Sequence, residues 1–241
     1  TLHIQEGVNL GLVGESGSGK TTLGRLLLKL YSADSGQIFL RGQDVARLSS
    51  SQFRPFRKNI QMVFQDPYSS LDPRYTIRNI LKEALALDKK LSSLEEQKRM
   101  EQVLKDVGLG VDALSRFPHE FSGGERQRIA IARALIMHPQ LLILDEAVSS
   151  LDVLVQQQII ELLKRLQDQY SLTYIFISHN LRVVRKLCQQ IAVMYQGKIV
   201  EFALTEDVFN RPAHPYTQEL LSAAVSYRSK GEDSMNRGPH E

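Results

Sequence analysis

The chain has 241 residues, which is enough for one large domain or for one core with an inserted subdomain. Its formal net charge of +3 is too small to indicate a nucleic-acid partner. The single cysteine, Cys188, excludes an internal disulfide and a cysteine metal cluster, and suits a reducing compartment. The sequence has no run of about 18 apolar residues, so it predicts no transmembrane helix.

The beginning of the chain lacks the features of a secretory signal. Thr1 is followed almost at once by a strand-like segment. We therefore expect that the chain is truncated and that the true N-terminus lies upstream of Thr1.

Apolar runs typical of strands recur along the chain, and helical stripes separate many of them. The runs are Val8–Val13, Gln37–Leu40, Ile60–Phe64, Leu141–Leu144, Thr173–Ile177 and Ile191–Tyr195. Several are apolar throughout, as strands buried on both faces are. The helical stripes include Leu23, Leu26, Leu27 and Leu30, and also Ile159, Leu162, Leu163 and Leu166. This alternation predicts an α/β fold with a mostly parallel sheet covered on both faces.

The stretch from about Thr76 to Val107 is charged and helical, without strand-like runs. Ser92-Ser93 followed by Glu95-Glu96 predicts a helix start within it. We expect a helical subdomain at about 67–125, inserted into an α/β core at about 1–66 and 126–210. A C-terminal helix and polar tail should occupy about 211–241, and the tail after about Arg228 should be disordered.

Residues 14–21 read GESGSGKT and match the phosphate-loop pattern G-x-x-x-x-G-K-[ST], between a predicted strand and a predicted helix. Glycines let the backbone approach phosphates closely, and successive N–H groups then point at them. Lys20 should lie between the β- and γ-phosphates, and the Thr21 hydroxyl should bind Mg²⁺. The alternative is a chance Gly-rich turn, which the flanking elements disfavour. The candidate nucleotide-binding residues here are Gly14, Glu15, Ser16, Gly17, Ser18, Gly19, Lys20, Thr21 and Thr22.

Two acids end the apolar run LLILDE at residues 141–146. The carboxyl ends of parallel strands form the ligand edge of such a sheet. We expect Asp145 to bind Mg²⁺ through water and Glu146 to act as the general base for the attacking water. The alternative is that both acids only cap a helix.

Two further polar side chains follow predicted strands. His179 lies in YIFISHN at residues 174–180, just after a predicted strand, and the family resemblance given below implies that it contacts the γ-phosphate. Gln65 follows Ile60–Phe64, and we expect it to bind Mg²⁺ and the attacking water where the core meets the insert. The alternatives are a structural histidine and a solvated glutamine.

The phosphate loop, Gln65, the two acids and His179 follow one another along the chain in the order found in the ATP-binding cassette (ABC) ATPases, which this chain resembles. These proteins have a RecA-like P-loop NTPase core with an inserted helical subdomain. The most specific element is EFSGGERQRIAIARAL at residues 120–135. Its residues Ser122, Gly123, Gly124 and Glu125, after Phe121, resemble the family signature LSGGQ. Glu125 replaces a glutamine there, and we expect Arg126 and Arg128 to offset its charge.

The resemblance implies a head-to-tail dimer, in which the signature at the start of a helix over Glu125–Met137 binds the ATP of a second cassette. The alternative for the signature is an ordinary Gly-rich helix cap. Ser149–Asp152 resembles the D-loop, which would carry Asp152 across the dimer interface. Ala147 stands where the family usually has proline.

The family also stacks adenine on an aromatic residue that lies before the first strand. The sequence shows no such aromatic residue, and His3 is no convincing substitute. We therefore expect weaker ATP affinity than in the full-length protein.

Within the family, residues 63–74 (VFQDPYSSLDPR) and 214–221 (HPYTQELL) are similar to ATPases of oligopeptide, dipeptide and nickel importers. This implies two transmembrane permease subunits, an extracytoplasmic substrate-binding protein, and a place on the cytoplasmic face of the membrane. Tyr68, Leu71, Tyr75 and Ile77 either form the groove that accepts the membrane subunits or pack in the core of the insert.

The interpretation is therefore a transport ATPase that uses ATP and Mg²⁺ and imports peptides. One alternative is a cassette of a tandem-ATPase subunit that imports nickel, glutathione or another small solute. Others are ABC ATPases of DNA repair or translation, and a regulatory module without hydrolysis. The insert is too short for the coiled coil of the repair proteins. The translation factors carry two cassettes, and only one is visible here. Glu146 and His179 favour hydrolysis and so argue against a purely regulatory module. The transported solute cannot be read from the sequence.

Overall fold

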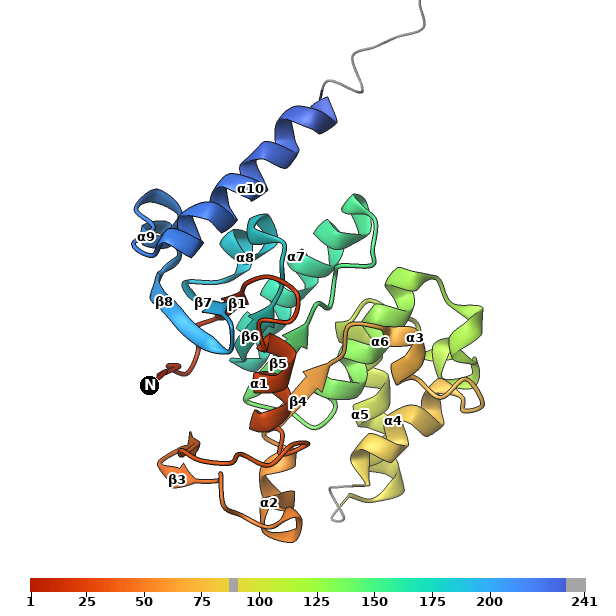
Figure 1. Ribbon diagram of the computed structural model, residues 1–241. Helices are drawn as coiled ribbons and strands as arrows, with labels where there is room; N and C mark the ends of the chain where they lie inside the picture. The colour runs from red at the N-terminus through yellow and green to blue at the C-terminus, as the bar shows by residue number, and fades with distance from the viewer. Residues whose placement is uncertain (87–90, 233–241) are drawn as a thin grey trace, which may run out of the picture.

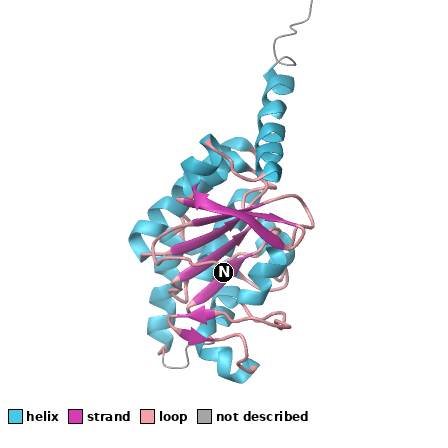
Figure 2. Cartoon of the chain, turned by 60° about the vertical axis from the view of Figure 1, so that its left-hand side comes forward, coloured by secondary structure: helices cyan, strands magenta, loops and turns pink. Residues whose placement is uncertain are grey.

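The computed structural model describes residues 1–86 and 91–232. A six-stranded sheet forms the centre, and a two-stranded hairpin lies apart from it (Figure 1). Figure 2 shows helices on both faces of the main sheet. The fold is thus the α/β arrangement predicted from the alternation of strands and helices.

The strands are short, and five of the six in the main sheet are mostly buried. Those of the main sheet are β1 (Leu10–Val13), β4 (Ile60–Val63), β5 (Leu141–Asp145), β6 (Thr173–Ile177), β7 (Gln190–Tyr195) and β8 (Lys198–Leu204); the hairpin is β2 (Phe39–Leu40) and β3 (Gln43–Asp44).

The order of strands in the main sheet is β4-β5-β6-β1-β7-β8. All neighbouring strands are parallel except β7 and β8, which are antiparallel. The carboxyl ends of β4, β5, β6 and β1 therefore lie side by side at one edge of the sheet. The segments that follow these four strands carry the predicted site.

Side chains on the central strands alternate between two apolar layers. On β5, Leu142 and Leu144 belong to the larger core, and Ile143 faces the smaller one beside α1. On β6, Tyr174 and Phe176 face the larger core in the same way. Burial on both faces explains why these strands read as continuous apolar runs.

The α-helices are α1 (Lys20–Leu27), α2 (Ser50–Arg57), α3 (Pro67–Ser70), α4 (Ile77–Leu85), α5 (Ser93–Asp106), α6 (Gly123–Leu135), α7 (Val153–Tyr170), α8 (Leu181–Leu187), α9 (Thr205–Asn210) and α10 (Pro215–Glu232), and the 3₁₀ turns are η1 (Val111–Ser115) and η2 (Pro118–Glu120).

Helices and turns fill the chain between β4 and β5, and α3 to α6 lie together on one side of the molecule (Figure 1). The helix start predicted at Ser92 is confirmed, because Ser92 and Glu95 form a capping box that opens α5. The extents of the core, insert and tail given above stay predictions. Residues 87–90 of the predicted insert lie outside the described part.

The structure differs from the predicted elements at several ends. Leu30 is not part of a helical stripe: α1 ends at Leu27, Lys29 adopts a left-handed backbone (φ 54°), and Leu30 is exposed. The run Gln37–Leu40 contributes only the short β2, and in the hairpin rather than the main sheet. The helix predicted over Glu125–Met137 begins two residues earlier and ends at Leu135.

The C-terminal region also differs in part. Strand β8 escaped prediction because its side chains are mostly exposed or half-buried at the sheet edge. Helix α10 continues through Arg228 to Glu232, so residues 229–232 are helical rather than disordered as predicted. Residues 233–241 of that tail lie outside the described residues. Within the described ranges, no helix is long and apolar enough to cross a membrane.

Candidate functional site

The loop from Gly14 to Gly19 joins the end of β1 to the start of α1. Gly14, Gly17 and Gly19 have φ values of 148°, 80° and 104°, which side chains with a Cβ rarely adopt. A Cβ on Gly14 would also lie 2.1 Å from the carbonyl oxygen of Met194. No side chain caps α1 at Gly19, so the first N–H groups of the helix are left for a ligand.

Lys20 is the first residue of α1, and its side chain folds back under the loop. Only 6% of the residue is exposed. Its Nζ donates hydrogen bonds to the carbonyl oxygens of Gly14 (2.8 Å) and Glu15 (2.6 Å). Burial lowers the pKa of Lys20, while the nearby carboxylates of Glu146 and Asp145 oppose this shift. The ammonium group is thus held by dipoles beneath an open, N–H-rich loop, which fits a polyphosphate.

Thr21 and Asp145 meet at the ligand edge. The Thr21 hydroxyl donates to Oδ1 of Asp145 at 3.0 Å. Burial raises the pKa of Asp145, and the Thr21 hydrogen bond acts against this rise. A hydroxyl and a carboxylate are the oxygen ligands that Mg²⁺ prefers. Among the described residues, no group of three or more His, Cys, Asp or Glu side chains is placed to hold a metal ion.

Glu146 lies just beyond β5, between Gln65 and His179. Gln65 Nε2 donates to Glu146 Oε2 at 2.8 Å, and His179 Nδ1 lies 3.2 Å from Oε1. The Glu146 backbone N–H donates to the carbonyl oxygen of Ile177 on the neighbouring strand. Its φ of 47° is uncommon for a residue with a Cβ and costs roughly 1–2 kcal/mol. The sheet thus imposes a strained backbone that aims the carboxylate at the ligand edge.

The signature residues open α6. Ser122 accepts a hydrogen bond from the Glu125 backbone N–H, and the Glu125 carboxylate accepts one from the Ser122 backbone N–H at 2.8 Å. This bond lowers the pKa of Glu125, with smaller contributions from Arg116 and Arg128. Arg126 lies over the Tyr68 ring instead, so it is not the partner expected for Glu125.

The start of α7 lies beside the signature. Asp152 caps α7 by accepting the Val155 N–H at 3.0 Å. A Cβ on Gly124 would lie 2.6 Å from Val155 Cγ1, so the two helices approach closely at this glycine.

The structure thus places the predicted residues in two groups. One group lies at the ligand edge and contains Gln65, Asp145, Glu146, His179 and the loop 14–21. The other comprises Ser122–Glu125 and Asp152, at the starts of α6 and α7. No hydrogen bond or ion pair between described residues joins the signature to the phosphate loop. Thr22 lies on α1 with its side chain exposed.

Two residues that contact the phosphate loop escaped sequence reasoning. Tyr216 accepts the Glu15 backbone N–H, and the Gly197 N–H donates to the carbonyl oxygen of Ser18. The HPYT segment around Tyr216 stood out in the sequence, but only as a mark of a subgroup.

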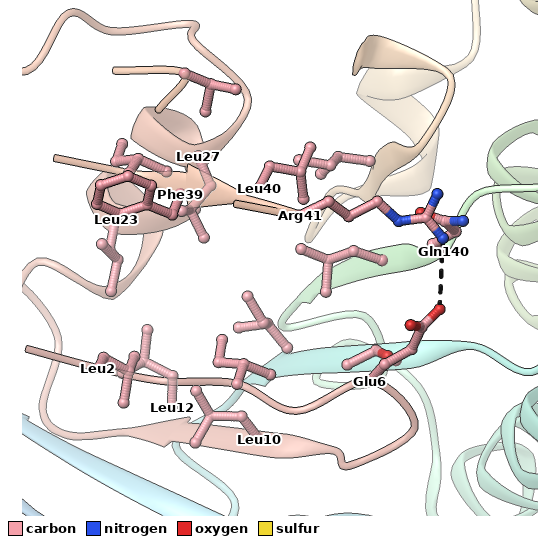
Figure 3. Close-up of a pocket in the computed structure, with 18 of the residues that line it drawn as sticks. Leu2, Glu6, Leu10, Leu12, Leu23, Leu27, Phe39, Leu40, Arg41 and Gln140 are labelled. Atoms are coloured by element: carbon pink, nitrogen blue, oxygen red, sulfur yellow. Dashed lines mark ion pairs between the residues drawn. The ribbon is translucent and has the colours of Figure 1, made fainter. Parts of the chain in front are cut away.

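An apolar cavity of about 480 Å³ lies away from the phosphate loop. Its walls come from the N-terminal segment, α1, the β2–β3 hairpin and the starts of β1, β4, β5 and β6 (Figure 3). An ion pair between Arg41 and Glu6 (3.7 Å) lies at its side. Because the cavity is apolar and near the amino ends of the strands, it does not suit a polyphosphate.

Comparisons with known proteins agree with this arrangement. Residues 1–149 match the family model "ABC transporter", and residues 200–239 match "Oligopeptide/dipeptide transporter, C-terminal region". The chain is 48% identical to the oligopeptide transport ATP-binding protein AppF of Bacillus subtilis over 238 residues, which cover 98% of this chain and 72% of that protein. It is 48% identical to OppF of Streptococcus mutans over 224 residues, covering 92% and 73% respectively.

Solved structures also resemble the fold. One is CbiO1 from Clostridium perfringens, part of the ABC transporter complex CbiONQ, with a TM-score of 0.79 and 26% identity over 97% of this chain and 89% of that one. Another is the ATP-binding cassette MJ0796 in a dimeric post-hydrolysis state with ADP and phosphate, with a TM-score of 0.75 and 28% identity over 85% of this chain and 88% of that one. The chain therefore belongs to the ABC transporter family and is an ATP-binding cassette that hydrolyses ATP to ADP and phosphate.

Proposed function

We propose that this chain is the ATP-hydrolysing motor subunit of an importer for peptides. The observation that carries the proposal is the match of residues 200–239 to the C-terminal region of oligopeptide and dipeptide transporters, beside relatives named for peptide transport. A cassette never touches the solute, so the peptide specificity rests on this kinship and not on the geometry of the site.

In this proposal the loop 14–21 holds the phosphates through its backbone N–H groups and Lys20. Thr21, Asp145 and Gln65 hold Mg²⁺, which would neutralise charge on the phosphate oxygens. The 3.0 Å contact between Thr21 and Asp145 supports this assignment.

Glu146 acts as the general base. Its carboxylate takes a proton from the water that attacks the γ-phosphorus, while Gln65 and His179 keep the carboxylate oriented. His179 also lies where it can contact the γ-phosphate. The contacts of both side chains with Glu146 support these roles.

A second cassette completes the site. Ser122 and Asp152 are exposed at the starts of α6 and α7, as residues reaching toward another chain must be. Next to Asp152, Val153 and Leu154 are 70% and 72% exposed, which is unusual for aliphatic side chains and supports an interface there. The partner is a copy of this chain or a related cassette.

Two membrane-spanning subunits would bind the helical side of the molecule, on the cytoplasmic face of the membrane, and a substrate-binding protein would deliver the peptide. Tyr68 and Tyr75 are 59% and 43% exposed and are candidates for this contact. Leu71 and Ile77 are buried, so for them core packing is the correct alternative.

The test is purification of the tagged chain from membranes in mild detergent, followed by reconstitution in vesicles. We expect two integral membrane subunits to copurify, and ATP hydrolysis to rise when a peptide-loaded binding protein is added. Copurification with ribosomes or DNA instead, or an importer stimulated only by a non-peptide solute, would contradict the proposal.

A further inference from the structure

The HPYT segment at residues 214–217 starts α10, and β8 holds it in place. The Glu201 carboxylate accepts the backbone N–H groups of Ala213 and His214, both at 2.9 Å. The Tyr216 N–H donates to His214 Nδ1 at 3.2 Å. These bonds satisfy N–H groups at the start of the helix and fix the position of Tyr216.

The Tyr216 side chain is buried against β7. Its ring centroid lies 4.2 Å from that of Tyr195, and only 7% of the residue is exposed. Its hydroxyl oxygen accepts the Glu15 backbone N–H at 2.9 Å, across 201 positions of sequence. Burial raises the pKa of Tyr216, so the group is a neutral hydroxyl at physiological pH.

The same side of the phosphate loop has two more contacts with the C-terminal part of the chain. The Gly197 N–H donates to the Ser18 carbonyl oxygen at 3.0 Å. Gly14 lies so close to the Met194 carbonyl that a Cβ would not fit. The turn from β7 to β8 and the HPYT segment therefore support the loop from the side of the C-terminal part of the chain.

We propose that Tyr216 is a positioning residue of the phosphate loop, and that the C-terminal region typical of peptide-transporter cassettes fixes the loop in its phosphate-binding conformation. A loop that binds through backbone N–H groups gains affinity when these groups are already oriented, because less order must be created on binding. The Tyr216 hydroxyl holds the first amide after Gly14 and so sets the direction of those that follow. The inference rests on the phosphate-binding role proposed for residues 14–21.

The variant that tests this is Tyr216→Phe, which removes the hydroxyl and keeps the ring. The matched control is Tyr195→Phe, which removes the hydroxyl of the other ring; that hydroxyl accepts from Gln196 Nε2 at 3.2 Å. Binding of ATP and of inorganic tripolyphosphate to each protein is measured by calorimetry, and unfolding is measured in urea. Tripolyphosphate has no base or sugar, so it reports on the loop alone.

We expect Tyr216→Phe to raise the Kd for both ligands by the same factor, about 2- to 10-fold, as for the loss of one hydrogen bond. Tyr195→Phe should leave both Kd values unchanged. Unchanged Kd values in Tyr216→Phe, or weaker binding of ATP but not of tripolyphosphate, would overturn the inference. If the unmodified chain bound neither ligand, the proposed role of the loop would fail instead.

Hydrogen exchange in the unmodified chain provides a measurement that does not depend on how the variant folds. In the unmodified chain without nucleotide, the Glu15 amide should exchange more slowly than in an unstructured peptide, because its N–H donates a hydrogen bond to the Tyr216 hydroxyl oxygen. This protection should be lost in Tyr216→Phe and kept in Tyr195→Phe. Exchange of the Glu15 amide at the unstructured rate in the unmodified chain would refute the proposal.

Discussion

The side-chain amide of Gln65 donates a hydrogen bond to Oε2 of Glu146 at 2.8 Å, although 81 positions separate the two residues. The bond forms because β4 and β5 are parallel neighbours whose carboxyl ends meet at one edge. It restrains the carboxylate that is proposed to act as general base.

We expect Gln65→Ala to lower kcat for ATP hydrolysis about 10- to 100-fold, since a hydrogen bond to a charged group contributes roughly 1.5–3 kcal/mol. The Kd for ATP measured without Mg²⁺ should change little, because Gln65 is not among the residues proposed to bind the phosphates directly. Gln61→Ala is the control, because the Gln61 amide on the same strand donates to the Arg57 carbonyl instead. Equal kcat values for both variants and the unmodified chain would show that Gln65 does not orient Glu146.

Asp106 joins the end of α5 to α7. Its carboxylate accepts hydrogen bonds from Gln102 (2.9 Å), Gln169 (3.0 Å) and the Tyr170 hydroxyl. Burial alone would raise the pKa of Asp106, but these hydrogen bonds together lower it. We expect Asp106→Ala to reduce the free energy of unfolding by about 2–4 kcal/mol at pH 7, because partly buried donors lose their partner.

The stabilisation by Asp106 should depend on pH in a defined direction. Because the pKa is lower in the folded state than in the unfolded state, the contribution is complete above the unfolded value of about 3.9 and is lost as the pH falls through the folded value. Urea unfolding at several pH values should show the difference between Asp106→Ala and the unmodified chain shrinking below about pH 4. The exposed Asp168 on α7 provides the control Asp168→Ala. A difference that grows on acidification would contradict the account.

Gly124 and Gly123 are neighbours in the first turn of α6 with different surroundings. A Cβ on Gly124 would lie 2.6 Å from the stiff side chain of Val155, whereas one on Gly123 would lie 3.8 Å from Leu151. Gly124→Ala should therefore lower the free energy of unfolding by about 1–3 kcal/mol. Gly123→Ala should be neutral, or stabilising by up to about 1 kcal/mol. Urea unfolding of both variants measures these changes in the free energy of unfolding. Equal changes in the two variants would mean that α6 and α7 do not approach each other as described.

Glu125 replaces the glutamine usual in the signature, and its carboxylate is engaged by the Ser122 backbone N–H. Because glutamine can also close a capping box, Glu125→Gln should change the free energy of unfolding by less than about 1 kcal/mol. Glu125→Ala should cost more, because the Ser122 N–H loses its acceptor. Thermal unfolding of the two variants measures the change in stability. A larger loss of stability in Glu125→Gln than in Glu125→Ala would exclude the capping role of Glu125.

Local patterns predicted most of the ligand edge. GESGSGKT and LLILDE each carry their chemistry within a few residues, and the parallel order of buried strands brings Gln65, Glu146 and His179 together as expected. Contacts that depend on tertiary structure were not predictable. Nothing near Tyr216 in the sequence indicates that its hydroxyl meets Glu15, and the apolar Leu30 gives no sign that α1 ends before it.

The most direct test of the account is the variant Glu146→Gln, which keeps the size of the side chain and removes its basicity. ATP binding, ATP hydrolysis and oligomeric state are measured together, with Lys20→Ala as the variant expected to lose binding. We predict that Glu146→Gln binds ATP with unchanged affinity, loses turnover, and accumulates as a dimer in the presence of ATP. Normal turnover in Glu146→Gln would contradict the assignment of Glu146 as the general base.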